Sequence, residues 1–157
     1  MPSITSCLWF DNNLEEAAQF YTSVFPNSTI ETLERYTEAG PGTPGDVVWG
    51  AFVLDGTRFM GINGGPQFSF SEAVSFMIEC ADQDEVDYYW DRLLDGGEES
   101  QCGWLKDRFG VSWQVTPTRL LELTTDPDPA RAAAATKAMH GMRKIVIAEL
   151  EDAVSGV

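Results

Sequence analysis

The sequence predicts an α+β fold made of two similar modules and a helical extension. Three observations predict it. A strand-like run followed by an amphipathic helix pattern recurs after about seventy residues, hairpin-type turns separate further candidate strands, and helix signals alone remain after Pro117. We therefore expect a domain over residues 1–117, with modules of about 1–66 and 67–117, and a C-terminal extension over 118–157. Each module would contain a strand, a helix and then about three strands.

The first module begins with a β-prone run over residues 4–10, followed by a helical pattern over residues 14–21. Asn12 stands at the expected N-cap of this helix, and Glu15 can bond back to it as in a capping box. Further strands are expected over residues 29–36, 47–54 and 58–63.

The second module repeats this pattern. Asp82 takes the cap position seventy residues after Asn12 (82 − 12 = 70), and Glu85 completes a second capping box. The same offset relates apolar positions of the two helices, namely Phe20 with Trp90 and Val24 with Leu94. Strands are expected over residues 74–78, near 98–105, and over 111–116. The alternative is that any two strand–helix units look alike.

Two turns carry typical hairpin signals. Asp55-Gly56 favours a two-residue turn, and residues 107–110 favour a type I turn closed by the left-handed Gly110. The segment 40–45 reads G-x-G-x-x-G, but its prolines and the strand after it remove the geometry that cradles a phosphate. We interpret it as a mobile loop.

The tail carries its own helix signals. Asp128 and Pro129 form a helix start that leads into the alanine-rich residues 130–139. After Gly141, a second helix is expected over residues 142–154. These helices would dock on the core or on a partner subunit.

Composition excludes several classes of function. Ten basic against 25 acidic residues give a net charge of −15, which would repel nucleic acid and anionic membrane surfaces. No apolar run approaches the ~20 residues that span a bilayer, and the N-terminus shows no signal-peptide pattern. The three cysteines are an odd number with no C-x-x-C pair, which favours reduced thiols. We therefore expect a cytoplasmic protein.

The chain resembles the vicinal oxygen chelate superfamily, which contains glyoxalases, bleomycin-resistance proteins and extradiol dioxygenases. The closer match is its PhnB-like branch, labelled 3-demethylubiquinone-9 3-methyltransferase. The residues that carry this resemblance are 2–26, 59–66 (FMGINGGP), 101–114 (QCGWLKDRFGVSWQ) and, in the tail, 126–129. The resemblance implies two βαβββ modules that form a curved mixed sheet around a cleft, usually in a homodimer.

Metal-using members of the superfamily donate ligands from the first and last strands of each module. By strand position, the corresponding residues here are Thr5, Met60 or Gly61, Ser75 and Gln114. Transition metals need imidazole, carboxylate or thiolate ligands, and of this set only Gln114 offers even a weak donor. The single histidine, His140, lies in the tail. We therefore expect no metal and no other cofactor; the glycine-rich strand–helix turn that holds a methyl donor is also missing.

Strand alternation suggests what would line the cleft. If Thr5 faces it, Cys7 and Trp9 do too, while Leu8 and Phe10 pack under the helix. In the second module the same alternation directs Ser75, Met77, Glu79, Ser112, Gln114 and Thr116 inward. The candidate ligand-binding residues are Thr5, Cys7, Trp9, Gly61, Asn63, Ser75, Met77, Trp104, Lys106 and Gln114. The alternatives are that the inward residues fill a core, and that Trp104 and Lys106 only pack around a hairpin.

Catalytic residues are not identified by these patterns. Cys7 has no histidine beside it to activate the thiol, and Glu79 is a lone carboxylate at a strand end. The sequence favours a metal-free homodimer that binds a small, partly apolar molecule. The alternative is an enzyme, either a metal-dependent lyase, isomerase or dioxygenase, or a methyltransferase.

Overall fold

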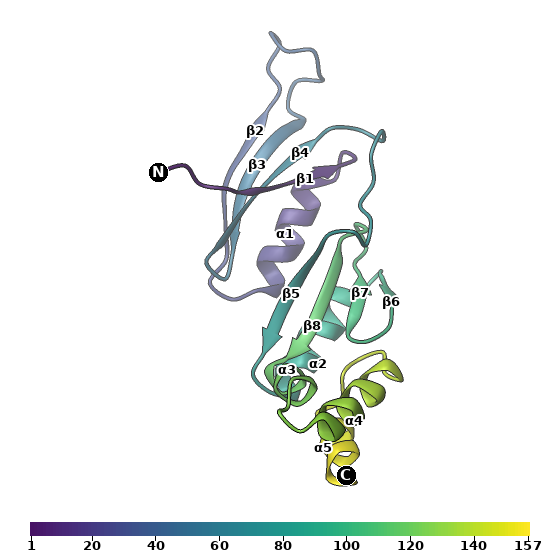
Figure 1. The fold of residues 1–157 in the computed structure, drawn as a ribbon. Coiled ribbons are helices and arrows are strands. Elements are labelled where there is room, and N and C mark those ends of the chain that lie inside the picture. Colours follow the sequence, from purple (N-terminus) through teal and green to yellow (C-terminus); the bar gives the residue numbers. More distant parts are fainter. The chain divides into compact units, whose positions relative to one another are not determined.

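The computed structural model describes all 157 residues and divides the chain into two compact units, Met1–Phe70 and Ser71–Val157 (Figure 1). Each unit contains one strand–helix–three-strand module, and three further helices belong to the second unit. The predicted α+β fold with a duplicated module and a helical tail is confirmed. The domain limits at residues 66 and 117 stay a prediction.

The first unit is a four-stranded mixed sheet covered on one face by a helix (Figure 1). Its strand order is β1-β4-β3-β2, with β1 parallel to β4 and the other pairs antiparallel. The core lies between helix and sheet, where Phe52 stacks with Tyr21 and Phe59. The elements are β1 (Ser6–Phe10), α1 (Leu14–Val24), β2 (Thr29–Arg35), β3 (Val47–Leu54) and β4 (Thr57–Asn63).

The second unit repeats this arrangement with the strand order β5-β8-β7-β6. Val86, Trp90 and Leu93 are the buried residues of its helix α2, and Trp113 lies on the sheet face that this helix covers. The elements are β5 (Ser75–Cys80), α2 (Gln83–Leu94), β6 (Glu98–Glu99), β7 (Trp104–Lys106), β8 (Ser112–Pro117), α3 (Thr118–Thr124), α4 (Pro129–His140) and α5 (Ile147–Ser155).

The repeat has two offsets rather than one. The first strands end at Phe10 and Cys80, an offset of 70 (80 − 10), as predicted. The buried helix residues Tyr21 and Trp90 are 69 apart (90 − 21). The loop before α1 is one residue longer than the loop before α2, so the predicted pairing of Phe20 with Trp90 is wrong by one position.

The two helices begin differently. Asp82 caps α2 as predicted: its side chain accepts from Glu85 N at 3.0 Å, and Glu85 Oε2 accepts from Ala81 N at 2.8 Å. Asn12 does not cap α1, because it has a φ of 63° and lies one residue before the helix boundary at Asn13. The predicted capping box is therefore present in the second module only.

The predicted turns are confirmed, whereas one predicted strand is split. Asp55 and Gly56 both have positive φ, and Gly110 N donates to Asp107 O at 2.9 Å. The expected strand near residues 98–105 is interrupted between β6 and β7, where Cys102 and Gly103 have φ angles of 59° and 85°. Such left-handed backbone cannot continue a strand.

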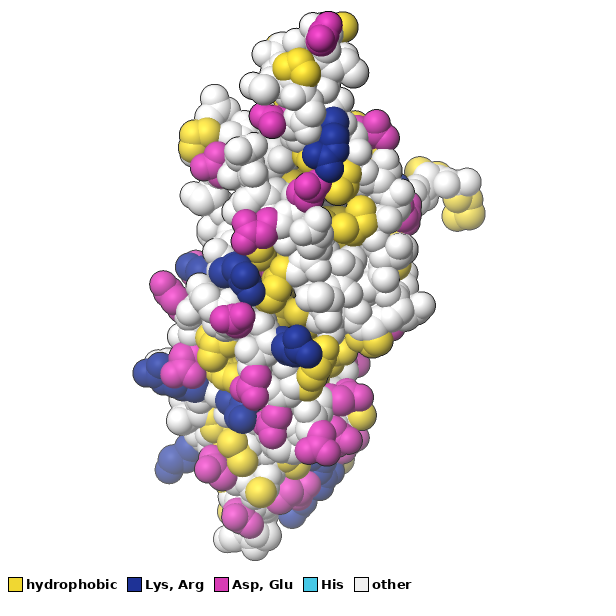
Figure 2. Space-filling model, turned by 180° about the vertical axis from the view of Figure 1, so that it is seen from behind, with side chains coloured by type: hydrophobic (Ala, Val, Ile, Leu, Met, Phe, Trp, Pro, Cys, Tyr) yellow, Lys and Arg dark blue, Asp and Glu magenta, His cyan; other side chains and the backbone are white.

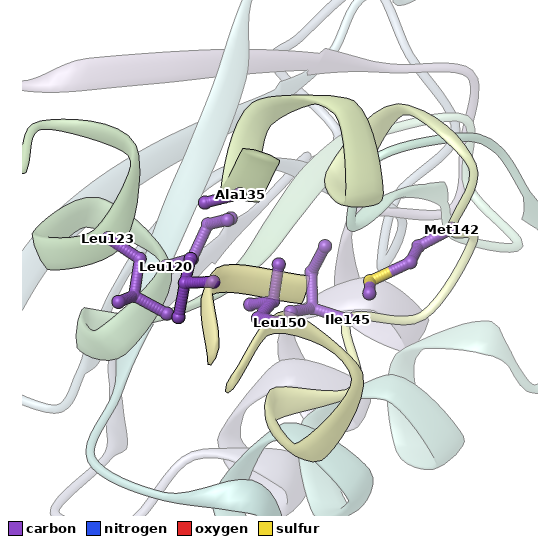
Figure 3. Close-up of a cluster of buried hydrophobic side chains, with 7 residues drawn as sticks. Leu120, Leu123, Ala135, Met142, Ile145 and Leu150 are labelled. Atoms are coloured by element: carbon purple, nitrogen blue, oxygen red, sulfur yellow. The ribbon is translucent and has the colours of Figure 1, made fainter. Parts of the chain in front are cut away.

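The tail packs on itself and on the second module. Side chains from α3, α4, α5 and the segment before α5 form one apolar cluster around Leu120, Leu123, Ala135, Ile145 and Leu150 (Figure 3). Asp128 caps α4 as predicted, by accepting from Ala130 N at 3.0 Å. No helix is both long and apolar enough to cross a membrane.

The last helix starts later than predicted, at Ile147 instead of residue 142. The backbone before it bonds to the second module, because Met142 O and Arg143 O accept from Cys102 N and Gly103 N. Gln83 then holds the next turn, accepting from Ile147 N at 2.8 Å and donating to Ile145 O at 3.0 Å. These bonds replace the helical pattern over residues 142–146.

Candidate functional site

Each sheet has one face under its helix and one face that points away from it. In the first sheet Leu8 and Phe10 are buried on the α1 side, so alternation places Cys7 and Trp9 on the other face. The strand register adds Met60 and Ile62 of β4 and Trp49 of β3 to these two residues. We call this the α1-distal face, defined by Cys7, Trp9, Trp49, Met60 and Ile62.

Two predicted site residues lie on the opposite, helix-covered face. Gly61 pairs with Leu8, and a Cβ atom added to it would lie 2.4 Å from Leu14 Cδ1. Asn63 Oδ1 accepts from Leu14 N at 3.0 Å, and Asn63 Nδ2 donates to Val47 O at 3.0 Å. Gly61 gives α1 room to approach the sheet, and Asn63 holds the start of α1. Both residues therefore lie on the same sheet face as Leu8 and Phe10, and their role in ligand binding stays a prediction.

Trp9 has a fixed position on the α1-distal face. Its Nε1 donates to Gly65 O at 2.9 Å, and its ring meets Phe68 edge-on at 4.9 Å between centroids. Gly64 is required beside it, since an added Cβ would lie 2.3 Å from the indole ring. Trp9 stays partly exposed and Phe68 is exposed, which leaves aromatic surface for contact with another molecule.

The other two first-module candidates carry less chemistry. Thr5 lies just before β1 and is partly exposed. Cys7 is exposed, and partial desolvation raises the pKa of its thiol, so no thiolate is favoured. Cys7 therefore adds polarisable surface rather than an activated nucleophile.

In the second sheet the polar residues gather on the face away from α2. Phe76 and Trp113 pair across β5 and β8, with ring centroids 5.5 Å apart, and Trp113 is buried on the α2 side. Alternation and register place the neighbouring residues on the other face. We call it the α2-distal face, defined by Ser75, Met77, Trp104, Lys106, Ser112 and Gln114.

Hydrogen bonding on the α2-distal face is incomplete. Gln114 Nε2 donates to Ser75 Oγ at 2.9 Å. Ser112 is 2% exposed, and its Oγ has no hydrogen-bond partner. Strand alternation predicts that Ser112 lies on this face. Nothing in the sequence shows that its hydroxyl lacks a partner, so Ser112 is not one of the predicted ligand-binding residues.

Trp104 and Lys106 lie on the same face as Gln114 and Ser112, with which they pair across β7 and β8. The Lys106 ammonium forms an ion pair with Glu72, on the segment before β5. This contact lowers the pKa of Glu72 and raises the pKa of Lys106. Glu72 was not predicted as part of the site, because its partner is distant in sequence.

The residues do not fit the metal centre of the metal-using superfamily members. The strand positions transferred from them hold Thr5, Met60, Ser75 and Gln114, which offer hydroxyl, thioether and amide groups. No group of three or more His, Cys, Asp or Glu side chains is arranged to hold a metal ion. This donor set lacks the imidazole, carboxylate and thiolate ligands that zinc or iron needs.

Comparison with known proteins gives one family. Residues 2–116 match the family model described as 3-demethylubiquinone-9 3-methyltransferase. Among solved structures, the chain is similar to the PhnB protein from Bacillus cereus, provisionally described as that methyltransferase. The identity is 37%, the TM-score is 0.69, and the match covers 74% of this chain and 99% of that chain. No curated protein matches the chain.

Two more distant structures share the fold. Protein PA1353 from Pseudomonas aeruginosa is 20% identical, with a TM-score of 0.62 over 74% of this chain and 98% of that chain. The genomically encoded fosfomycin resistance protein FosX from Listeria monocytogenes is 13% identical, with a TM-score of 0.52 over 74% and 93% of the two chains. One FosX structure is a complex with Mn(II).

The family match ends at Thr116, immediately before the end of β8, so it covers both modules and leaves out the tail helices. The expected resemblance at residues 126–129 lies outside it. The two βαβββ modules, the matched residues and the PhnB likeness agree with one another. The chain belongs to the PhnB-like, 3-demethylubiquinone-9 3-methyltransferase family.

Proposed function

We propose that the protein binds a small, partly apolar molecule without a metal ion. The observation that carries this proposal is the Ser112 hydroxyl, which is buried on the α2-distal face and has no hydrogen-bond partner. Buried polar groups nearly always have a partner, and each exception calls for an explanation such as a bound molecule. A ligand that bonds to this hydroxyl would supply the missing partner.

The surroundings of Ser112 suit such a ligand. Met77 is 46% exposed on the same face, and Trp104 is partly exposed, so apolar surface lies beside the polar groups. Binding sites for small molecules usually combine apolar and aromatic walls with a few placed polar groups.

The family description suggests a second activity, methyl transfer. The 37% identity to the PhnB protein is the observation in its favour. Against it, neither module has the strand, glycine-rich turn and helix that hold a methyl donor in doubly wound folds. We therefore place binding first. Each unit is taken by itself: the proposed ligand-contacting residues are Thr5, Cys7 and Trp9 in the first unit, and Ser75, Met77, Trp104, Lys106 and Gln114 in the second.

We also propose that the protein is a cytoplasmic homodimer without a nucleic acid partner. The three cysteines are all free, which suits a reducing compartment. The face shown in Figure 2 carries Asp and Glu side chains along both units, with basic side chains scattered among them. Light scattering after gel filtration tests the oligomer, since a dimer has twice the 17.3 kDa of the chain.

Binding is tested with two fluorescent probes that share an aromatic body. N-phenyl-1-naphthylamine is neutral, whereas 8-anilinonaphthalene-1-sulfonate carries a sulfonate. The proposal predicts saturable binding of at least one probe to the folded protein, unchanged by EDTA. It is overturned if neither probe saturates, or if EDTA abolishes binding and one equivalent of a transition metal restores it.

A further inference from the structure

Three hydrogen-bond donors stand in one row across the α2-distal face, and the row continues to the Glu98 carboxylate of β6, which pairs with Lys106. Ser75 of β5 pairs with Ser112 of β8, and Ser112 pairs with Lys106 of β7. Because neighbouring strands are about 4.8 Å apart, the row extends over roughly 10 Å, the size of a small ligand group and its surroundings. The row lies in the second unit alone.

This row has spare hydrogen-bond donors. Ser75 Oγ accepts from Gln114 Nε2, so its own O–H remains to donate. The Ser112 hydroxyl has no partner at all. Lys106 carries three N–H donors and a positive charge. The Glu72 carboxylate is its ion-pair partner, and Glu98 lies beside it across β6 and β7. A group that satisfies all three residues together must accept several hydrogen bonds, and a negative charge on it would be attracted by Lys106 and opposed by Glu98.

Glu72 already supplies such a group to one end of the row. It lies three residues before Ser75, at the β5 side of the sheet, yet its carboxylate reaches Lys106 on β7. The strand between β5 and β7 is β8, and Ser112 is the β8 residue at that level. The ion pair therefore joins the segment before β5 to β7, and Ser112 lies on the strand between them.

The Glu72–Lys106 ion pair is exposed to solvent. The side chains of Glu72 and Lys106 are 62% and 36% exposed. Exposed ion pairs of this kind contribute little to stability, since water and salt screen them. Another oxyanion can therefore replace the Glu72 carboxylate at small cost.

We propose that Ser75, Ser112 and Lys106 bind an oxyanion group of the ligand, and that Glu72 is an internal competitor that this group displaces from Lys106. The inference rests on the proposed function, because it assigns a chemical class to the ligand of the same face. The ligand is then a small molecule with an apolar body, lying against Met77 and Trp104, and one carboxylate-like or sulfonate-like end. Glu72 keeps Lys106 paired until that end arrives.

The first test removes the competitor. Glu72→Gln should tighten binding of the sulfonate probe about two- to fivefold, the effect of one exposed ion pair, and leave the neutral probe unchanged. Glu149→Gln is the matched control, since it removes the same charge from an exposed position on α5. Measurement at two salt concentrations separates local displacement from the change in net charge.

The second test removes the donors. Lys106→Gln should weaken the sulfonate probe about tenfold, and Ser112→Ala should weaken it about threefold, with little effect on the neutral probe. Lys137→Gln, at an exposed position on α4, is the control for loss of a positive charge. Circular dichroism and the thermal midpoint establish that each variant is folded.

The outcomes distinguish the two proposals. If both probes bind but Glu72→Gln behaves like Glu149→Gln, or if Lys106→Gln weakens both probes equally, the oxyanion row is wrong while ligand binding stands. If neither probe binds the wild-type protein, both proposals fail. Where the sulfonate probe binds, 1-naphthoate and inorganic phosphate are tested as competitors against it. Displacement by 1-naphthoate alone would show that the oxyanion must carry an apolar body.

Discussion

The two modules have the same topology, but different residues hold the starts of their helices. The start of α1 is held by Asn63, which is 49 residues away from Leu14 in sequence, whereas α2 is capped by its neighbours Asp82 and Glu85. Their helix-distal faces differ too. The first is aromatic and apolar, while the second carries hydroxyl, amide and ammonium groups. The two modules therefore share their strand order, whereas the hydrogen bonds at their helix starts and the side chains on their helix-distal faces differ.

The largest difference between the modules in the free-energy cost of a substitution should appear at the turns before their last strands. Asp107 is buried and accepts from Phe109 N, Val111 N and Trp113 Nε1. Asp107→Ala should cost about 3 kcal/mol or more, because it leaves buried donors without a partner. Asp55→Ala, at the exposed turn of the first module with a φ of 45°, should cost about 1 kcal/mol.

Urea unfolding followed by tryptophan fluorescence measures both variants. Asp107→Asn is the accompanying control, since it keeps one acceptor oxygen and should fall between wild type and Asp107→Ala. Equal costs at the two turns would contradict the view that only the second turn depends on a buried side chain.

The helix starts provide the next comparison. Asn63→Ala removes two partly buried hydrogen bonds and should cost about 2 kcal/mol. Asp82→Ala removes one exposed cap and should cost about 1 kcal/mol. Asn12→Gly should be neutral or stabilising, since Asn12 has a φ of 63° and glycine adopts this conformation freely. If Asn12→Gly lowers the free energy of unfolding by about 1 kcal/mol or more in the same assay, Asn12 does stabilise the start of α1 as predicted.

The tail distinguishes the second unit further, and Gln83 is its main polar link to α2. Gln83→Ala removes the side-chain bonds to Ile145 O and Ile147 N and should cost about 1–2 kcal/mol. Hydrogen exchange should show faster exchange in α5 than in α1. Gln101→Ala, at an exposed position, is the control and should change neither quantity. Unchanged protection of α5 in Gln83→Ala would show that the apolar cluster alone holds the tail.

The smallest expected effect is on the stability of the second unit at low pH. Four carboxyl groups with lowered pKa values all lie in the second unit, in ion pairs or hydrogen bonds: Glu72, Asp87, Asp126 and Glu151. Because their folded-state pKa values lie below the unfolded ones, their stabilisation is complete above about pH 5 and is lost as the pH falls through the folded values.

The second unit should therefore lose protection before the first on acidification, by a small amount because these groups are exposed. Hydrogen exchange at pH 7 and at pH 3.5 measures this, and Glu151→Gln should reduce the difference. Earlier loss in the first unit would contradict the assignment of acid sensitivity to these pairs.

Much of the fold could be predicted because its signals are local. The Asp82 capping box, the Asp128 helix start and the Asp55-Gly56 turn each depend on residues within a few positions of one another. Alternation likewise separated Cys7 and Trp9 from the core positions Leu8 and Phe10. Strand positions transferred from the family do not show which face a residue occupies, and the structure places Gly61 on the face that α1 covers.

The sequence by itself determined the duplicated module, the helix and turn signals, the acidic charge and the poverty of metal ligands, since these follow from residue type and short-range spacing. Only the tertiary structure decided that Asn63 holds α1, that Ser112 lacks a partner and that Glu72 pairs with Lys106. Each of these depends on strand register, which brings distant segments together. Because a shift of one residue in register turns every side chain to the other face, such contacts cannot be deduced from local pattern alone.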